Sequence, residues 1–296
     1  MAEDMGKYPW WLQNSLFSIP ELWSLPTLQK VRVAILDTGI SEHVDFDFSV
    51  ITGYNYLEDS TDFQHDVFGH GTHCAGIIAA KGIKSYGIAP DTELFIAKVC
   101  DDFGRPVLTA VKNALNDIYL DRNTGNDVKI INMSLDLVSQ GPDDDQLISD
   151  IESLLGKLIL EKHCLVICAA GDFDDDHNSF PARLGVCIAA GSISSNLLRS
   201  SFSRTTPILG IMAPGDGILS SGDTDSTRSL SGTSQAAAFV TGVCSLVIQK
   251  MPDGSFSSDT LKKFLFQTAY SDSFSPTEYG NGIIQPNKLM EAIKEL

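Results

Sequence analysis

Three polar side chains stand in segments that suit chemistry at a turn: Asp37 in LDTGIS, His70 in GHGTHCAG and Ser234 in SGTSQAAAFVTG. A serine hydroxyl becomes a nucleophile when a base takes its proton, and histidine supplies that base near neutral pH. An aspartate fixes the histidine tautomer and stabilises the imidazolium. Each residue alone has an ordinary alternative, such as a helix cap or a packed histidine. Together, in the order Asp, His, Ser, they indicate a nucleophilic hydrolase.

The order of these residues along the chain argues against two other enzyme classes. In α/β-hydrolases the catalytic histidine follows the serine, whereas all six histidines of this chain precede Ser234. A dinucleotide-binding domain would place a GxGxxG motif after its first strand, and this chain has DTGIS there. We therefore expect neither of these classes.

Short, continuously apolar runs alternate with amphipathic segments, which is the pattern of a parallel sheet covered on both faces. The predicted strands are residues 31–36, 94–99, 128–134, 164–170 and 185–191. The predicted helices are residues 107–120, 145–161, 233–249, 258–268 and 286–295. The alternation predicts an α/β fold, a single-domain doubly wound and mostly parallel sheet flanked by helices. We expect residues 1–296 to form this one domain, with residues 1–30 as an N-terminal extension that packs on it.

The three motifs resemble those of the subtilisin-like serine proteases, the subtilase family. DTGI, HGTHCAG and GTSQAAA carry the resemblance, which extends over almost the whole chain. It implies a subtilisin-like fold in which Asp37 is the orienting acid, His70 the general base and Ser234 the nucleophile. It also implies a set of residues that contact the substrate, namely Ser134, Leu135, Asp136, Ala169, Ala170 and Gly171.

The chain departs from the family pattern at the oxyanion hole. The resemblance implies that the Ser234 backbone N–H and the side chain at position 172 hold the oxyanion. The family usually has asparagine there, whereas this chain has Asp172. An ionised aspartate only accepts hydrogen bonds, and a protonated one can donate. We expect burial at the site to favour the protonated form.

A second departure concerns the first specificity pocket. The family usually has glycine where this chain has Asp136, at the rim of the pocket, and Asp174, Asp175 and Asp176 follow the next pocket wall closely. Carboxylates in this place would pair with a cation of the substrate. We therefore expect the pocket to accept lysine or arginine.

The resemblance implies no organic cofactor, and we expect no metal ion at the active site. Many subtilases bind calcium at a loop that here, at residues 81–86, is short and lacks the asparagine ligands. Asp45 resembles one ligand of that site and is the candidate for calcium. Cys74, one helical turn after His70, resembles the free thiol beneath the catalytic histidine in one subtilase subgroup.

Charge and composition restrict the partners and the compartment. The 296 residues include 38 acidic and 21 basic ones, so the net charge is −17. Nucleic acid and anionic membranes repel a protein with this charge. We find no apolar run of membrane-spanning length, and we expect neither a signal peptide nor an inhibitory propeptide within these residues. The six cysteines lie in apolar runs, which favours free thiols in a reducing compartment. We expect a cytoplasmic protein that meets a peptide or protein substrate, and the sequence leaves its oligomeric state open.

Three functions stay open on the sequence alone. The favoured one is a serine endopeptidase that forms an acyl-enzyme and processes a restricted peptide or precursor. The alternative is a degenerate subtilase that binds peptides without efficient cleavage, and Asp172 supports it. A small-molecule esterase or amidase would use the same three residues.

Overall fold

A seven-stranded parallel sheet forms the centre of the computed structural model, which describes residues 8–125, 127–173, 179–272 and 274–295. The strand order is β2-β3-β1-β4-β5-β6-β7. The strands are β1 (Arg32–Asp37), β2 (Thr52–Asn55), β3 (Glu93–Lys98), β4 (Val128–Met133), β5 (Leu165–Ala169), β6 (Ile188–Ile193) and β7 (Ile211–Pro214). An antiparallel hairpin of β8 (Ile218–Ser221) and β9 (Thr227–Leu230) stands apart from this sheet.

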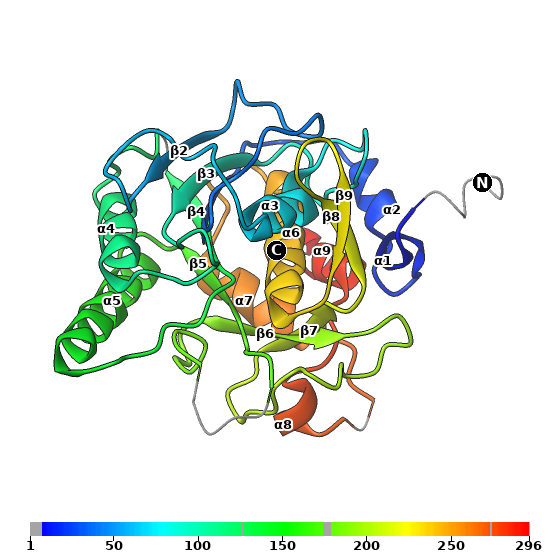
Figure 1. Ribbon diagram of the computed structural model, residues 1–296. Coiled ribbons are helices and arrows are strands. Elements are labelled where there is room, and N and C mark those ends of the chain that lie inside the picture. Colours follow the sequence, from blue (N-terminus) through cyan, green and yellow to red (C-terminus); the bar gives the residue numbers. More distant parts are fainter. Residues whose placement is uncertain (1–7, 126, 174–178, 273, 296) are drawn as a thin grey trace.

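Helices cover both faces of the sheet because its inner strands are apolar on both sides. Every residue of β1, β3 and β6 is buried, and such strands need cover on each face. The helices are α1 (Trp10–Gln13), α2 (Ile19–Trp23), α3 (His70–Ala79), α4 (Leu108–Tyr119), α5 (Pro142–Leu160), α6 (Thr233–Gln249), α7 (Ser258–Gln267), α8 (Pro276–Tyr279) and α9 (Pro286–Lys294). Helices α4 and α5 pack together on one side, and α3, α6 and α9 lie on the other (Figure 1). The predicted α/β fold is confirmed.

Helix α6 is the central helix of the molecule. Every residue in it except Ser234 is buried, and the helix packs against β4, β5, β6 and β7. On another side, Gly242 lets α6 approach the segment before β3 closely, since a Cβ added to Gly242 would lie 2.9 Å from Cβ of Ile88. The packing fixes the N-terminus of α6 against the sheet and so positions Ser234.

The carboxyl ends of three adjacent strands supply the other predicted site residues. Asp37 is the last residue of β1, Ser134 follows β4, and Ala170 follows β5. In a parallel sheet these ends meet along one edge, where α/β proteins bind ligands. The topology therefore brings the motifs together although they are far apart in the sequence.

The described part of the N-terminal extension packs on the back of α6. The rings of Trp11 and Phe17 meet the ring of Phe239 edge-on, with centroids 5.7 and 5.3 Å away. Trp23 Nε1 donates a 2.7 Å hydrogen bond to the carbonyl oxygen of Ile88.

Among the described helices, none combines the length and the apolar character that a bilayer span requires.

Candidate active site

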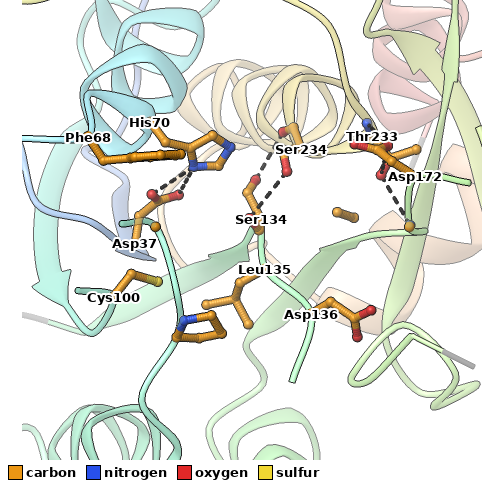
Figure 2. A pocket seen from close by; sticks show the side chains of 14 residues that line it. Asp37, Phe68, His70, Cys100, Ser134, Leu135, Asp136, Asp172, Thr233 and Ser234 are labelled. Carbon is orange, nitrogen blue, oxygen red and sulfur yellow. Dashed lines mark hydrogen bonds and ion pairs between the residues drawn. The ribbon is translucent and has the colours of Figure 1, made fainter. Parts of the chain in front are cut away.

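Asp37 and His70 form a hydrogen-bonded pair at the carboxyl edge of the sheet. His70 Nδ1 lies 2.8 Å from Oδ1 and 3.0 Å from Oδ2 of the buried Asp37 side chain (Figure 2). A carboxylate accepts this hydrogen bond, so Nδ1 carries the hydrogen and Nε2 keeps a lone pair. The pair thus holds the imidazole in the tautomer that a general base needs.

Local backbone contacts position this pair. Thr38 N donates to Asp37 Oδ1 at 2.8 Å, and Gly71 N donates to Thr38 Oγ1 at 2.9 Å. Position 71 must be glycine, because a Cβ there would lie 2.2 Å from the carbonyl oxygen of Gly39. The start of α3 can therefore approach the loop after β1 closely.

The structure adds two positioning residues that the sequence analysis missed. Asp66 accepts hydrogen bonds of 2.8 Å from Gly69 N and from Thr72 N, and so satisfies orphan amides at the start of α3. The buried Lys98 ammonium donates at 2.8 Å to the carbonyl oxygen of Thr38. An acidic residue shortly before a predicted helix is a capping signal, but no sequence pattern marks Lys98.

The charges around His70 favour its protonated form. Burial lowers the pKa of His70, but the charge and hydrogen bond of Asp37, with help from Asp66 and Asp172, outweigh it. The net effect raises the pKa above the ordinary value of 6.5. As the pH is lowered, a reaction that needs the neutral imidazole should therefore begin to slow at a somewhat higher pH than usual.

Ser234 lines the same pocket but hydrogen-bonds elsewhere. Its Oγ donates to the carbonyl oxygen of Ser134 at 3.2 Å rather than to His70 (Figure 2). In return, Ser134 Oγ donates to the carbonyl oxygen of Ser234 at 2.9 Å. The Ser234 hydroxyl must turn from this carbonyl oxygen before it can donate to the imidazole, and such contacts often tighten only when substrate binds.

Asp172 is hydrogen-bonded to Thr233, the residue before Ser234. Its Oδ1 accepts a 2.8 Å hydrogen bond from Thr233 N and a 2.9 Å bond from Thr233 Oγ1. The residue is exposed, so the burial that we expected here is not found. Oδ2 is the carboxylate oxygen that is left for a ligand.

One pocket of about 370 Å³ joins most of the predicted site residues. It is lined by Asp37, Phe68, His70, Cys100, Gly104, Pro106, Ser134, Leu135, Asp136, Ala169, Gly171, Asp172, Thr233 and Ser234. Ala170, which we expected to contact substrate, lies behind this lining, where its N–H donates to the carbonyl oxygen of Ala190 at 3.0 Å. Phe68, Cys100, Gly104 and Pro106 are lining residues that no sequence motif indicated.

Asp136 is exposed at one end of the pocket. Its Oδ1 accepts a 2.9 Å hydrogen bond from Phe180 N, and its Oδ2 accepts a 3.1 Å bond from Ser179 Oγ. These contacts hold the carboxylate in place. The predicted acidic run at residues 174–176 lies outside the described residues.

Cys74 is buried one turn beyond His70 in α3. Burial, followed by the Asp37 charge, raises the pKa of the Cys74 thiol well above its usual range. The thiol therefore stays protonated at neutral pH, which makes it a poor nucleophile.

The surroundings of Asp45 do not fit calcium. The buried carboxylate accepts hydrogen bonds from Ile83 N at 2.6 Å, from Ser85 N at 2.7 Å and from Lys84 N at 3.0 Å. Ser85 Oγ adds a fourth donor at 3.0 Å. Calcium needs six to eight oxygen ligands, whereas here N–H groups converge on the carboxylate from the short loop.

Comparison with known proteins identifies the family. A profile described as the subtilase family matches residues 29–282. The chain is 34% identical over 259 residues to a thermostable alkaline protease of Halalkalibacterium halodurans, over 87% of this chain and 66% of that protein. It is 30% identical over 296 residues to an intracellular serine protease of Paenibacillus polymyxa, over 95% of this chain and 85% of that protein. The crystal structure of a cold-adapted subtilisin-like serine proteinase matches with a TM-score of 0.72 at 25% identity, over 88% of this chain and 89% of that one. The chain therefore belongs to the subtilase family of serine proteases, which act on peptides or proteins.

Proposed function

We propose that the protein is a serine endopeptidase whose catalytic triad consists of Asp37, His70 and Ser234. The observation that carries this proposal is the 2.8 Å bond between Asp37 and His70 in the pocket that Ser234 also lines. In this arrangement the acid orients the base and the base faces the pocket of the nucleophile. That is the division of roles by which a triad is recognised.

The reaction begins when the Ser234 hydroxyl turns from the Ser134 carbonyl oxygen toward His70. Oγ attacks the peptide carbonyl carbon while Nε2 of His70 takes the hydroxyl proton, and Asp37 stabilises the imidazolium. The intermediate collapses to an acyl-enzyme when His70 gives this proton to the leaving amine. A water molecule then attacks the ester by the same route and releases the second product.

We propose that Asp172 stands at the oxyanion hole, where its carboxyl group can donate a hydrogen bond only when it is protonated. The Ser234 backbone N–H would supply one donor, and the Asp172 carboxyl group the other. Because two Thr233 donors already occupy Oδ1, the proton would sit on Oδ2. When Asp172 is ionised it repels the oxyanion instead, and loss of one donor costs roughly 10²–10³ in kcat.

We propose a restricted processing role for this peptidase, in the cytoplasm. Asp136 at one end of the pocket favours peptides with a lysine or arginine at the cleavage site. The cysteines are buried free thiols, which suits a reducing compartment, and one relative is named an intracellular protease. The short loop on Asp45 supports the further proposal that this chain dispenses with calcium at that position.

A second candidate function is peptide binding without efficient cleavage. Two observations favour it: Ser234 Oγ bonds to Ser134, and the exposed Asp172 is not the usual asparagine. A fluorophosphonate probe distinguishes the two functions, because it reacts only with an activated serine. We expect the wild type to be labelled at Ser234 and to cleave peptides, and Ser234→Ala to do neither while it stays folded. An unlabelled, folded wild type would favour the binding function.

A further inference from the structure

A buried arginine lies behind the part of the pocket wall that carries the two carboxylates. Figure 2 shows Asp136 and Asp172 on the side of the pocket away from His70. Arg204 is only 6% exposed, behind this lining. A Cβ added to Gly171, which lines the pocket, would lie 3.2 Å from Cζ of Arg204. The guanidinium group therefore packs directly against the back of the wall.

Arg204 holds the backbone of this wall on both sides of Asp172. Its main-chain N donates to the carbonyl oxygen of Gly171 at 3.1 Å, and its Nε donates to the carbonyl oxygen of Phe173 at 3.2 Å. Phe173 has a φ of +74°, in the left-handed region that a bulky side chain rarely adopts. Its N also donates to the carbonyl oxygen of Phe202 at 2.6 Å. These bonds keep an unfavourable backbone conformation in place.

The same guanidinium group reaches Asp136 through one hydroxyl group. Arg204 Nη1 lies 2.9 Å from Oγ of the buried Ser179, which lies 3.1 Å from Asp136 Oδ2. Because an arginine side chain only donates and an ionised carboxylate only accepts, Ser179 must accept from Arg204 and donate to Asp136. Phe180 N holds the other carboxylate oxygen at 2.9 Å. Arg204 thus determines the direction of one of the two bonds that orient Asp136.

We propose that Arg204 is a positioning residue, which acts through Ser179 to hold the Asp136 carboxylate where it pairs with a cationic side chain of the peptide. The inference rests on the proposed cation preference of the peptidase and names a residue that sets it. A carboxylate that is oriented before the peptide arrives binds with less ordering of side chains. The guanidinium fork has fixed geometry and spans Phe173 and Ser179, whereas a lysine ammonium would keep the charge without the fork.

Two peptides that differ only in the residue before the cleaved bond, lysine or methionine, test the proposal. The measured quantity is the ratio of their kcat/KM values. We expect the wild type to favour the lysine peptide and Asp136→Asn to lose most of this preference. Ser179→Ala and Arg204→Lys should each lower the ratio about tenfold, the change that loss of one hydrogen bond to a charged group produces. Neither of these two substitutions changes the net charge beside the pocket, so the ratio reports on the position of Asp136.

A double variant shows whether Arg204 and Ser179 act in series. In the Ser179→Ala protein, Arg204→Lys should lower the ratio no further. In the Asp136→Asn protein, neither substitution should change it. Arg183→Lys is the matched control, because the Arg183 guanidinium lies over the Phe180 ring, 4.9 Å from its centroid, and Arg183 bonds to Ser179 through its main-chain N. This control should keep the wild-type ratio.

The results separate this proposal from the function on which it rests. If Ser179→Ala and Arg204→Lys keep the wild-type ratio, or slow both peptides equally, the role of Arg204 is structural only and the proposal is wrong. Additive effects in the double variant would also contradict it. If Arg204→Lys does not fold, Ser179→Ala decides alone, since an unchanged ratio excludes any action through Ser179. A wild type that a fluorophosphonate labels but that has no lysine preference overturns this proposal and leaves the endopeptidase function standing. An unlabelled wild type that cleaves neither peptide overturns both.

Discussion

The two halves of the active site differ in how completely they are assembled. On one side, Asp37 and His70 are joined by a 2.8 Å hydrogen bond, and Thr38 and Asp66 hold the segments around them. On the other side, the Ser234 hydroxyl bonds to a backbone carbonyl. In the oxyanion hole that we propose on this side, the chain also has Asp172 where a donor is needed.

The difference follows from where the contacts of each half originate. Most contacts of the acid–base half join residues between 37 and 72, and Lys98 of the adjacent strand β3 adds one more, so few segments determine its geometry. The nucleophile half combines α6 with the loops after β4 and β5, which are distant in the sequence. We infer that the first half is ready for catalysis before substrate binds and that the second half limits the rate.

The largest expected effect comes from breaking the assembled half. In Asp37→Asn the side-chain amide would donate a hydrogen to Nδ1 and so favour the wrong imidazole tautomer. We expect kcat to fall about 10⁴-fold, with little change in the melting temperature. Asp47→Asn serves as the control, because Asp47 is exposed and bonds only locally to Ser49. The measurement is the rate at which the wild type, Asp37→Asn and Asp47→Asn hydrolyse one peptide substrate. A fall in kcat of less than tenfold in Asp37→Asn would contradict the role of Asp37.

A second prediction concerns Asp45, whose carboxylate holds the loop after α3. The loop that Asp45 holds carries Ser85, whose Oγ lies 2.7 Å from Ser221 Oγ in β8. Asp45→Asn would point amide hydrogens at backbone N–H groups and lose charge-assisted hydrogen bonds of about 1.5–3 kcal/mol each. One such bond corresponds to a lowering of the melting temperature by several degrees for a chain of this size.

Calcium separates this account of Asp45 from a metal site. We expect the Ser234→Ala protein, which cannot digest itself, to melt at the same temperature in millimolar calcium and in EDTA. Asp45→Asn in that background should lower both values equally. If calcium raises the melting temperature and Asp45→Asn abolishes the increase, Asp45 is a calcium ligand and our proposal is wrong.

A third prediction is a pH dependence of stability from His73, which links α3 to the hairpin before Ser234. Its Nε2 lies 3.0 Å from the carbonyl oxygens of Ile218 and Arg228, and its buried Nδ1 has no partner among the described residues. Burial, followed by the charge of His70, lowers the pKa of His73 from 6.5 to about 4. The folded chain thus binds this proton less readily than the unfolded chain, so stability is full above pH 6.5 and falls as the pH drops toward 4.

A comparison of variants isolates the His73 contribution. We expect on the order of 3 kcal/mol of this pH dependence to disappear in His73→Gln, whose amide still donates to the two carbonyl oxygens. His163→Gln, which replaces an exposed histidine, should unfold with the wild-type pH dependence. Urea unfolding of the three proteins at pH 7 and pH 4 measures the difference. If the free energy of unfolding changes equally between pH 7 and pH 4 in the wild type and in His73→Gln, the assignment to His73 is wrong.

Much of the fold could be predicted because the composition of the inner strands and of α6 indicates that these elements are buried. The predicted helix 233–249 matches α6, whose small apolar residues need burial on all sides. The strand predicted at 185–191 instead spans residues 188–193 as β6. The residues before β6 form a turn in which Cys187 N donates to the carbonyl oxygen of Leu184 at 2.9 Å, and Lys262 of α7 binds the carbonyl oxygens of Gly185 and Val186. A contact from so distant a segment is invisible in the local pattern, as is the short, half-exposed β2.

Only the site residues that lie in or beside recognisable motifs could be predicted. DTGI, HGTHCAG and GTSQAAA mark the side chains with chemical roles, since those positions combine reactive groups with obligatory small neighbours. Phe68 and Lys98 carry no such mark, because their roles arise from loops that meet only in the folded chain. The expected burial of Asp172 was wrong for the same reason, since exposure depends on the loops around it.

The most direct test of the difference between the halves is kcat against pH for the wild type and Asp172→Asn. His70 must be neutral to act as the base, so we expect the rate of both proteins to fall at acid pH, while the exposed Asp172 gives the wild type no permanent second donor for the oxyanion. Asp172→Asn supplies a permanent donor and should raise kcat at neutral pH, by up to roughly 10²–10³. It should keep the acid limb that His70 sets. If Asp172→Asn leaves the rate unchanged at every pH, Asp172 has no part in the oxyanion hole and the nucleophile half is not what limits this enzyme.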